Sequence, residues 1–392
     1  ASSQEMTAAQ IPQHAATLVK AVDPQYGGLK GAPKFPQAPI FAFLWESYLR
    51  DYSHSARDAV LLTLTNICNG GIYDHLAGGM ARYSTDHKWL APHFEKMLYD
   101  NAQFVSLLTR AWLRTEDPLY FERLHETVNF VLADMTTAEG CFTSSYDADS
   151  EGEEGKYYVW EWREIEKCLD ANEFQIFTEK YDVSKGGNWE GRNILNRTNN
   201  PPPDDVETSR LLRSAKAKLL NARKSRPPPQ HDDKVLADWN GLFITALAEA
   251  ALVFDNHHWR DAAVRAFDAN MNIFWQDGRL LHSHRLNSTR HEAIADDYAN
   301  LIEAALTLYG LTAEPRYIAT AQELAMALER NHWDEENGGF FHASLARAQL
   351  PIASRTIDDD VTPSANALMI KNYGVLYHLT GEPIYQAKAD QI

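Results

Sequence analysis

The sequence predicts an all-α protein in which helices alternate with glycine-marked loops. Apolar residues recur at helical spacing in several segments, among them 41–49, 104–112, 299–309 and 324–328. Segment 242–252 is apolar on nearly every side, as expected of a helix buried within the molecule. Strand-like alternation is limited to two short pieces, 156–160 and 279–284, which fit small hairpins rather than a central sheet.

Glycine-containing segments recur between the predicted helices. Residues 23–29 and 334–340 share the form Asp-x-x-x-Gly-Gly-apolar, and shorter echoes lie at 139–142 and 277–280. Helix pairs joined repeatedly by such loops predict a helical toroid or solenoid. At about 30 residues for a helix and its connection, the chain has room for about twelve helices. Twelve is the number in an (α/α)6 barrel, which we therefore expect; an irregular all-α domain is the alternative.

Two proline runs interrupt this pattern. Residues 201–203 and 227–229 are all proline, and they bracket a basic, helix-prone segment at 208–225. Because proline fixes extended backbone and ends helices, this region is separated from its neighbours. Helical pairs continue in the same style on both sides, so we expect one domain over residues 1–392 with a surface excursion at about 198–230. A boundary between two domains is the alternative.

Composition excludes some classes of partner. The net charge of −17 argues against nucleic acid or an anionic membrane surface. No apolar run approaches the roughly 20 residues that span a bilayer, and residues 1–10 lack the features of a secretory signal. Cys68, Cys141 and Cys168 form no Cys-x-x-Cys pair, which predicts structural cysteines in a reducing, cytoplasmic compartment. A start at Ala1 rather than Met is expected of a processed or truncated piece of a longer protein.

The segment 70–101 combines four glycines with imidazole, guanidinium, carboxylate and phenol side chains. Four glycines fall within residues 70–79, although glycine carries a large entropic cost on folding. His75, Arg82, His93, Glu95 and Lys96 lie among or just after them, and we expect a helix to begin near residue 92. The segment therefore predicts the floor of a site; a long connector with solvated charges is the alternative.

The histidines of this segment suit proton transfer on a sugar. Epimerisation or aldose–ketose isomerisation needs a base next to a carbonyl, for which His75 and His93 are candidates. It also needs a group that stabilises the enediolate, for which Arg82 and Lys96 are candidates. A hydrogen bond that orders the loop is the alternative for His75.

Three acidic pairs suit glycoside hydrolysis instead. They are Asp147 with Asp149, Asp232 with Asp233, and Asp296 with Asp297. Hydrolysis needs two carboxyl groups about 5–10 Å apart, so one member of each pair is the candidate. Helix capping is the alternative for Asp296 and Asp297.

No metal or cofactor motif is evident. The acidic loop at 147–155 lacks the twelve-residue calcium pattern. His282 and His284 point to one face of a predicted strand, but no third ligand is near in sequence. We interpret them as a solvated strand face and predict no metal and no cofactor.

A series of motifs, taken in order, resembles a known family. They are Gly-Ala-Pro-Lys-Phe-Pro at 31–36, Gly-Gly-Ile-Tyr-Asp-His at 70–75, Pro-His-Phe-Glu-Lys-Met-Leu-Tyr-Asp-Asn at 92–101, the acidic loop 147–155, Asn-Trp-Glu-Gly at 188–191, Asp-Asp-Lys with Trp-Asn-Gly-Leu at 232–242, and Asp-Asp-Tyr-Ala at 296–299. From about residue 23 onward the chain resembles the YyaL family, also known as the spermatogenesis-associated protein 20 family. The resemblance implies a six-hairpin-glycosidase-like (α/α)6 toroid, related in fold to N-acylglucosamine 2-epimerases and several glycoside hydrolases.

The chain departs from the family pattern at three places. A thioredoxin-like domain usually precedes this region in the family and is not part of this sequence. The usual Gly-Gly-Gly-Phe-His-Arg-Tyr-Ser has Ala81 in place of its histidine, and the usual Pro-Ser-Gly-Asn-Ser reads Pro-Ser-Ala-Asn-Ala at 363–367.

The resulting hypothesis is a carbohydrate-active protein that binds a sugar or polyol in the cavity of the barrel. We predict epimerase-like histidine chemistry, with a glycoside hydrolase as one alternative and a non-catalytic scaffold for a thioredoxin-like partner as another. The predicted catalytic residues are His75, Arg82, His93, Glu95, Asp147, Asp233 and Asp297. The predicted substrate-binding residues are Tyr73, Lys96, Asp100, Asn101, Asp149, Trp189, Asp232, Lys234, Trp239, Asn240, Asp296 and Tyr298, whose aromatic members would stack on sugar rings. We expect these side chains to converge on one cavity near the barrel axis.

Overall fold

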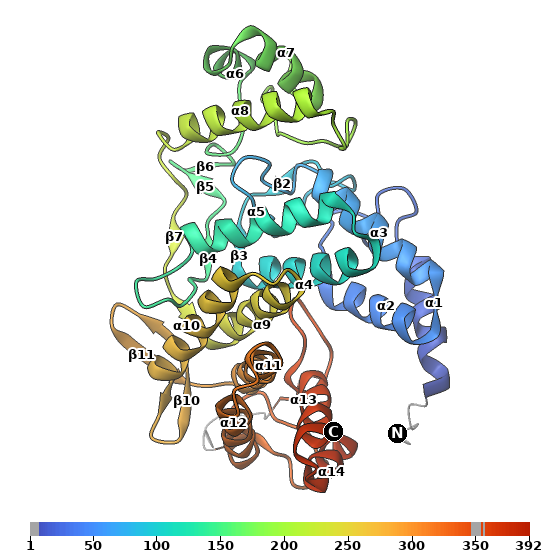
Figure 1. The fold of residues 1–392 in the computed structure, drawn as a ribbon, viewed down its shortest axis with the longest axis vertical. Helices are drawn as coiled ribbons and strands as arrows, with labels where there is room; N and C mark the ends of the chain where they lie inside the picture. Colours follow the sequence, from blue (N-terminus) through green and yellow to red (C-terminus); the bar gives the residue numbers. More distant parts are fainter. Residues whose placement is uncertain (1–7, 346–353, 356) are drawn as a thin grey trace. The chain divides into compact units, whose positions relative to one another are not determined.

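The computed structural model describes residues 8–345, 354–355 and 357–392, and most of their regular structure is helical (Figure 1). Residues 1–7, within the stretch predicted to lack a secretory signal, lie outside the described part. The chain divides into two compact units. Unit 1 comprises residues 1–100, 110–130 and 146–231, and unit 2 comprises residues 101–109, 131–145 and 232–392. The single domain expected from the sequence stays a prediction.

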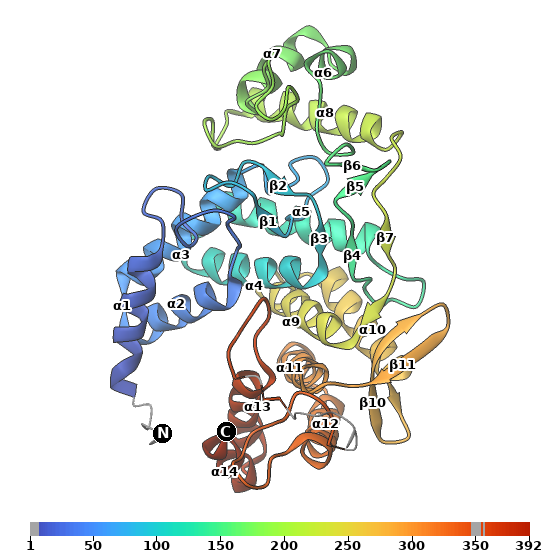
Figure 2. The same ribbon diagram turned by 180° about the vertical axis from the view of Figure 1, so that it is seen from behind.

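Unit 1 contains two groups of packed helices (Figure 2). In the first group α1 packs against α2 and α3, and in the second α6 and α7 pack against α8. A core that includes Trp160, Ile165, Phe177 and Leu219 holds the second group together. The helix predicted between the proline runs is confirmed as α8. The bounds are η1 (Ala8–Gln10), α1 (Ile11–Ala21), α2 (Ala38–Asp51), α3 (His54–Asn69), α6 (Trp162–Cys168), α7 (Ala171–Lys180) and α8 (Val206–Arg223). Helices α4 (Leu98–Thr115) and α5 (Pro118–Asp134) carry residues of both units.

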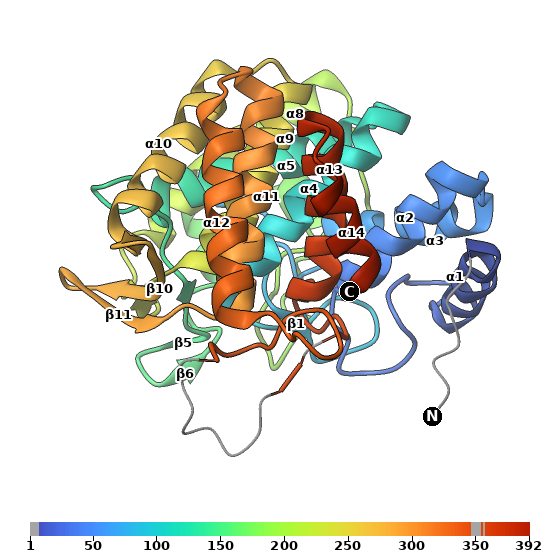
Figure 3. The ribbon, with the colours of Figure 1, turned by 90° about the horizontal axis from the view of Figure 1, so that it is seen from below.

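Unit 2 is built from helices that lie side by side (Figure 3). Helix α11 packs against α9, α12 and α13, and α13 packs against α14. Helix α9 is buried along most of its length, which confirms the buried helix predicted from its apolar sequence. The bounds are α9 (Ala237–Val253), α10 (His257–Phe274), α11 (Ala295–Thr312), α12 (Arg316–His332), α13 (Ala365–Thr380) and α14 (Pro383–Gln391).

The strands are short and lie between helices. The hairpin β10–β11 is the longest, and β10 also pairs with β8 and β9, which confirms the strand predicted at 279–284. In unit 1, β1 pairs with β2 and β5 pairs with β6. The bounds are β1 (Tyr83–Ser84), β2 (Pro92–His93), β3 (Lys96–Met97), β4 (Ser145–Tyr146), β5 (Asp149–Ser150), β6 (Glu153–Glu154), β7 (His231–Asp232), β8 (Val235–Leu236), β9 (Trp275–Gln276), β10 (Arg279–Arg285) and β11 (Ser288–Glu292).

Two local predictions are wrong. Residues 156–158 form a turn rather than a strand, because Tyr158 and Val159 donate backbone hydrogen bonds back to Gly155. The helix expected to begin near residue 92 begins at Leu98 instead. His93 lies in β2, where it pairs with Tyr83, and the Arg82 amide donates to the Glu95 carbonyl at 2.9 Å. Backbone pairing with the glycine-rich loop therefore keeps this segment extended.

Two further features bear on the predicted class of protein. Among the described residues, no helix is both long enough and apolar enough to cross a membrane. Burial raises the pKa of the Cys68 thiol, and it raises that of Cys141 to about 12, as expected of structural cysteines.

Candidate active site

Among the described residues, the Asp-x-x-x-Gly-Gly-apolar turn occurs with the same hydrogen bonds at Asp23, Asp74 and Asp334. At Asp74 the aspartate amide donates to the Gly79 carbonyl at 3.0 Å, and the Gly78 amide donates back to the Asp74 carbonyl at 2.9 Å. The turns at Asp23 and Asp334 repeat both bonds. In each copy the aspartate Oδ1 also accepts the amides two and three residues later. The sequence analysis found the copies at 23 and 334 but not the one at 74, although its pattern is the same.

The second oxygen of Asp74 accepts hydrogen bonds from two cations. Lys96 Nζ lies 2.8 Å from Asp74 Oδ2, and the guanidinium of Arg223 contacts both oxygens at 2.9 and 2.8 Å. The side chains of Asp74, Lys96 and Arg223, which we call the Asp74 cluster, are 6%, 4% and 3% exposed. Lys96 also donates to the carbonyl of Gly78 at 2.8 Å. Lys96, predicted to bind substrate, is therefore enclosed in a structural network.

His75 is also enclosed. Its side chain is 1% exposed, its Nε2 lies 2.9 Å from the Gly70 carbonyl, and its Nδ1 lies 3.5 Å from Arg123. Burial, together with the positive charge of Arg123, lowers the pKa of His75 to about 3. The imidazole is therefore neutral, and its contacts match the loop-ordering alternative. The neighbouring Tyr73 is buried too and donates its hydroxyl proton to Glu126.

Arg82, His93 and Glu95 are brought together at the pairing of β1 with β2. Arg82 Nη1 lies 3.1 Å and His93 Nε2 lies 3.5 Å from Glu95 Oε2, and His93 Nδ1 lies 2.7 Å from Glu154. The three side chains are partly exposed, so they can meet a ligand. Asp100 follows in the first turn of α4 and is buried.

The acidic residues of segments 147–149 and 232–233 contact solvent or nearby cations. Asp147 and Asp149 are exposed, and Asp147 accepts from the following amide of Ala148. Asp232 pairs with Lys234 at 3.1 Å, whereas Asp233 pairs with Arg285. These contacts leave their predicted roles as predictions.

Several predicted binding residues make contacts that stabilise the fold. Asn240, on α9, donates to and accepts from the backbone of Phe142. Asn366 of α13, which was not predicted as a binding residue, does the same with Phe340. The Tyr298 hydroxyl accepts from the Leu280 amide at 3.2 Å. Asn101 is fully buried, Trp189 lies edge-on against Phe94, and Trp239 is partly buried beside Asp238.

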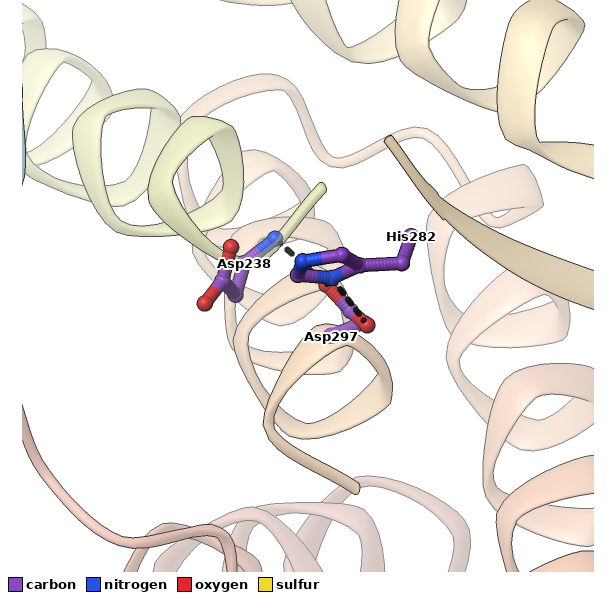
Figure 4. A group of neighbouring side chains, drawn as sticks. All are labelled: Asp238, His282 and Asp297. Carbon is purple, nitrogen blue, oxygen red and sulfur yellow. Dashed lines mark hydrogen bonds and ion pairs between the residues drawn. The ribbon is translucent and has the colours of Figure 1, made fainter. Parts of the chain in front are cut away.

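The first turn of α11 carries Asp296 and Asp297, and each of these carboxylates binds a histidine. Asp297 is fully buried, and both of its oxygens lie close to Nδ1 of His282, at 3.0 and 2.9 Å. The same oxygens accept the amides of Asp238 and Ile294 at 3.0 and 2.8 Å. Figure 4 shows His282 reaching from β10 to Asp297, with Asp238 of α9 beside them.

The neighbouring carboxylate forms a matching pair. Asp296 Oδ2 lies 3.1 Å from Nδ1 of His342, and Asp296 Oδ1 accepts the Ala365 amide at 3.1 Å. The side chains of His282 and His342 are 26% and 39% exposed, and in both rings Nδ1 is held, so Nε2 is the nitrogen left for another partner. We call Asp238, His282, Asp296, Asp297 and His342 the α11 cluster.

The α11 cluster has more carboxylates than cations, and its pKa values shift accordingly. Burial, reinforced by the charge of Asp297, raises the pKa of Asp238 to about 8. Burial alone would lower the pKa of His282, but the hydrogen bond and charge of Asp297 raise it to about 9. The pKa of His342 is raised chiefly by its hydrogen bond to Asp296. At neutral pH the cluster therefore holds protons on both a carboxyl and an imidazole.

Asp238, His282 and Asp297 also offer ligand atoms that lie within 4.8 Å of one another, as a metal site would require. However, both oxygens of Asp297 already accept a backbone amide and the His282 imidazole. This arrangement fits a carboxylate that orients a histidine better than a metal ligand.

Asp238, His282 and His342 were not predicted as site residues. His282 was interpreted as part of a solvated strand face, which is wrong, because the β10–β11 hairpin carries it onto the first turn of α11. In sequence, His282 is 15 positions from its partner Asp297, and Asp238 is 59 positions from the same residue. The available signal was the pair Asp296–Asp297 at a helix start, which the sequence analysis did identify.

Comparison with solved structures shows the fold. A D-mannose isomerase matches with a TM-score of 0.60 and 10% identity, over 98% of this chain and 85% of that one. The cellobiose 2-epimerase from Bacillus thermoamylovorans matches with a TM-score of 0.61 and 10% identity, over 98% and 84%. A family 76 α-mannanase from Bacteroides thetaiotaomicron gives 0.54 and 12%, over 98% and 82%. The predicted all-α fold, the (α/α)6 barrel of six-hairpin glycosidases, is confirmed.

Comparison of sequences shows relatives over nearly the whole chain. No family model matches the sequence. Human spermatogenesis-associated protein 20 is 32% identical over 97% of this chain and 55% of its own length. The uncharacterised protein B0495.5 of Caenorhabditis elegans is 28% identical, over 94% of this chain and 56% of its own length. The chain thus spans about half the length of the curated relatives it matches, and over that span its similarity to spermatogenesis-associated protein 20 confirms the resemblance to this family.

Proposed function

We propose that the protein is a sugar isomerase or epimerase that moves a proton with His282 and His342. A shared fold does not by itself assign a reaction, so the proposal depends on the residues. The observation that carries it is that two partly exposed histidines are held through Nδ1 by adjacent carboxylates of one helix turn. A carboxylate on Nδ1 fixes the tautomer and directs Nε2 to the reacting group.

The proposed reaction needs one proton donor and one acceptor. His282, with a pKa of about 9, is protonated at neutral pH and would give its Nε2 proton to the carbonyl oxygen of an open-chain sugar. His342 in its neutral form would take the proton from the adjacent carbon through Nε2, which leaves an enediol. When a proton returns to the other carbon and the hydroxyl of the first carbon loses its proton to a base, the product is the isomer. When a proton returns to the opposite face of the same carbon and the former carbonyl oxygen gives its proton back to His282, the product is the epimer.

The predicted base His75 does not fit this role. It is buried and neutral, with both ring nitrogens engaged. We therefore transfer the acid–base role to the two histidines of unit 2 and keep the class of chemistry that the sequence predicts. A neutral sugar or polyol as ligand, without nucleic acid or membrane as partner, also remains part of the proposal.

A glycoside hydrolase is the second candidate, because of one observation. Asp238, with its pKa raised to about 8, is a carboxylic acid at neutral pH beside the carboxylates of α11. Inverting and retaining hydrolases both need a protonated carboxyl group near an ionised one. In this reaction Asp238 would protonate the leaving oxygen.

Incubation with free sugars in deuterated water separates the candidates. We expect deuterium at C2 by NMR with the wild-type protein, and a loss of about 10²–10⁴-fold in exchange rate in His282→Gln or His342→Gln. His284→Gln is the matched control, since His284 lies on the same strand and its ring contacts the Thr289 hydroxyl at 2.8 Å rather than a carboxylate. Release of reducing ends from oligosaccharides would favour the hydrolase. No turnover of either kind would leave the scaffold for a thioredoxin-like partner.

The pH profile gives a second readout. The exchange rate should rise as His342 loses its proton and fall as His282 loses its own near pH 9. Asp238, Asp296 and Asp297 face both rings, and ionisation of Asp238 near pH 8 would retain the His282 proton further into the alkaline range. A profile that declines steadily from pH 6 upward would contradict these roles.

A further inference from the structure

Asp100 has a buried oxygen with no hydrogen-bond partner among the described residues. The side chain is 8% exposed and lies in the first turn of α4, and its Oδ2 is the atom without a partner. The Nε of Arg82 is likewise buried without one in the part of the chain that the structure describes. Buried polar atoms are rarely left unsatisfied, because each has given up its hydrogen bonds to water without gaining a partner. An unsatisfied carboxyl oxygen beside a guanidinium therefore calls for an explanation.

The groups that face Asp100 can be named. Arg82 and Glu95 are the charged groups whose fields act on its carboxyl, and they contact each other at 3.1 Å. The backbone bond from the Arg82 amide to the Glu95 carbonyl joins the same two residues. Tyr83 stacks on Phe35 at 4.6 Å and on His93 at 5.0 Å between ring centroids, so the loop that carries Arg82 is braced by packed rings. The side chains of Arg82 and Glu95 are partly exposed, whereas Asp100 is buried.

The protonation of Asp100 decides what this group can bind. Burial raises the pKa of Asp100 well above its usual range, the charge of Glu95 adds to the effect, and Arg82 opposes it. In its protonated form Asp100 donates one hydrogen bond, Arg82 donates others, and the carboxylate oxygens of Glu95 accept. Donors and an acceptor side by side match the hydroxyl groups of a polyol, since each hydroxyl both donates and accepts. An anionic ligand is disfavoured, because Glu95 already offsets the charge of Arg82.

We propose that Arg82, Glu95 and Asp100 form a hydroxyl-binding site in unit 1 that takes an uncharged sugar or polyol and discriminates against its carboxylated or phosphorylated forms. The sequence analysis expected Arg82 and Glu95 to be catalytic; the inference makes them binding residues with a defined ligand charge. It requires equilibrium binding only, so it is independent of whether the α11 cluster turns over a sugar.

Titration calorimetry with mannitol, glucose and glucuronate tests the proposal on the full chain. We expect mannitol or glucose to bind at least tenfold more tightly than glucuronate. Asp100→Leu should lose at least tenfold in affinity, because it removes the donor. The affinity of Asp100→Asn should stay within threefold of the wild type, because the amide still donates a hydrogen bond. If Asp100 bound the ligand as an ionised carboxylate instead, this variant would lose affinity. Arg82→Met should lose affinity, whereas Arg50→Met, at the exposed pair with Asp51 on α2, should not.

Separate measurements distinguish an effect on folding from an effect on binding or on the proposed reaction. Thermal unfolding of each variant identifies any affinity loss caused by misfolding, and Asp100→Leu should unfold no earlier than the wild type, since it replaces an unsatisfied polar group with an apolar one. Equal affinity for glucuronate and mannitol, unchanged affinity in Asp100→Leu, or no binding of any probe would each overturn the proposal. Asp100-dependent binding without isotope exchange would leave this site standing and refute the proposed reaction. Conversely, isotope exchange with wild-type affinity in Asp100→Leu would refute the site alone.

Discussion

The Asp74 cluster and the α11 cluster both place carboxylates in the interior, but they differ in their supply of positive charge. Asp74 meets two permanent cations, Lys96 and Arg223, and its pKa is driven well below the usual range by them despite burial. In the α11 cluster the cationic partners are imidazoles, whose charge depends on a bound proton. Burial therefore raises the pKa of Asp238 where it could not raise that of Asp74.

This difference separates a structural network from a reactive one. A carboxylate with two permanent cations has a single protonation state across the physiological range, so it can only hold the fold together. Carboxylates that share titratable partners exchange protons near neutral pH, and such perturbed groups are typical of functional sites. The Asp74 cluster therefore stabilises the glycine-rich loop around it, whereas the proposed proton transfer would take place at the first turn of α11.

The largest expected effect comes from removing the anion of the Asp74 cluster. Asp74→Asn leaves Arg223 and Lys96 buried without a counter-charge, so we expect a loss of about 3–5 kcal/mol in the free energy of unfolding. Urea unfolding at pH 7 measures it. Glu207→Gln on α8, which breaks an exposed pair with Arg210, is the control and should leave the midpoint at its wild-type value. A much smaller loss of unfolding free energy in Asp74→Asn would contradict the comparison of the two clusters, because the Asp74 cluster would then not stabilise the fold.

A smaller effect, with a characteristic pH dependence, is expected in the α11 cluster. Because the pKa of Asp238 is raised in the folded state, the folded protein binds more protons than the unfolded chain between about pH 4 and pH 8, and stability falls as pH rises through that window. His282 acts in the same direction, since its stabilising proton is lost as pH rises through about 9. Relative to the wild type, the free energy of unfolding of Asp238→Asn should therefore increase by about 1–3 kcal/mol between pH 5 and pH 8.

Urea unfolding of the wild type and of Asp238→Asn at one-unit pH intervals measures this difference in the free energy of unfolding. Asp149→Asn is the matched control, because Asp149 is an exposed acid. The difference in the free energy of unfolding between this variant and the wild type should not increase with pH. A gap between Asp238→Asn and the wild type that stays constant, or narrows towards pH 8, would mean that Asp238 ionises as an ordinary surface acid and would remove the contrast with Asp74.

Local patterns in the sequence predicted the fold well, whereas the partners of the site residues could not be read from it. Helical periodicity and the glycine turns indicated the (α/α)6 barrel, since both depend on neighbours within a few residues. The pairing of His282 with Asp297 depends on where a hairpin folds back, which no local spacing records. Lys96 is the opposite case: a motif rich in charges predicted a binding residue there, whereas the copy of the turn at Asp74 indicates a structural partner for the same cation.

That turn supplies the smallest expected effect, because its three copies differ in how deeply the cation is buried. Lys34 pairs with Asp23 at 3.1 Å and is 0% exposed, whereas Arg355 pairs with Asp334 at 2.7 Å and is 29% exposed. Lys34 also donates to the Gly27 carbonyl at 2.8 Å, as Lys96 does to Gly78. Lys34→Met removes both of these buried bonds, so we expect a loss of about 1–3 kcal/mol. Arg355→Met exchanges one bond for contacts with water, so its urea midpoint should move much less. Equal losses in the two variants would show that the backbone turn, rather than the burial of the cation, sets the contribution of each copy.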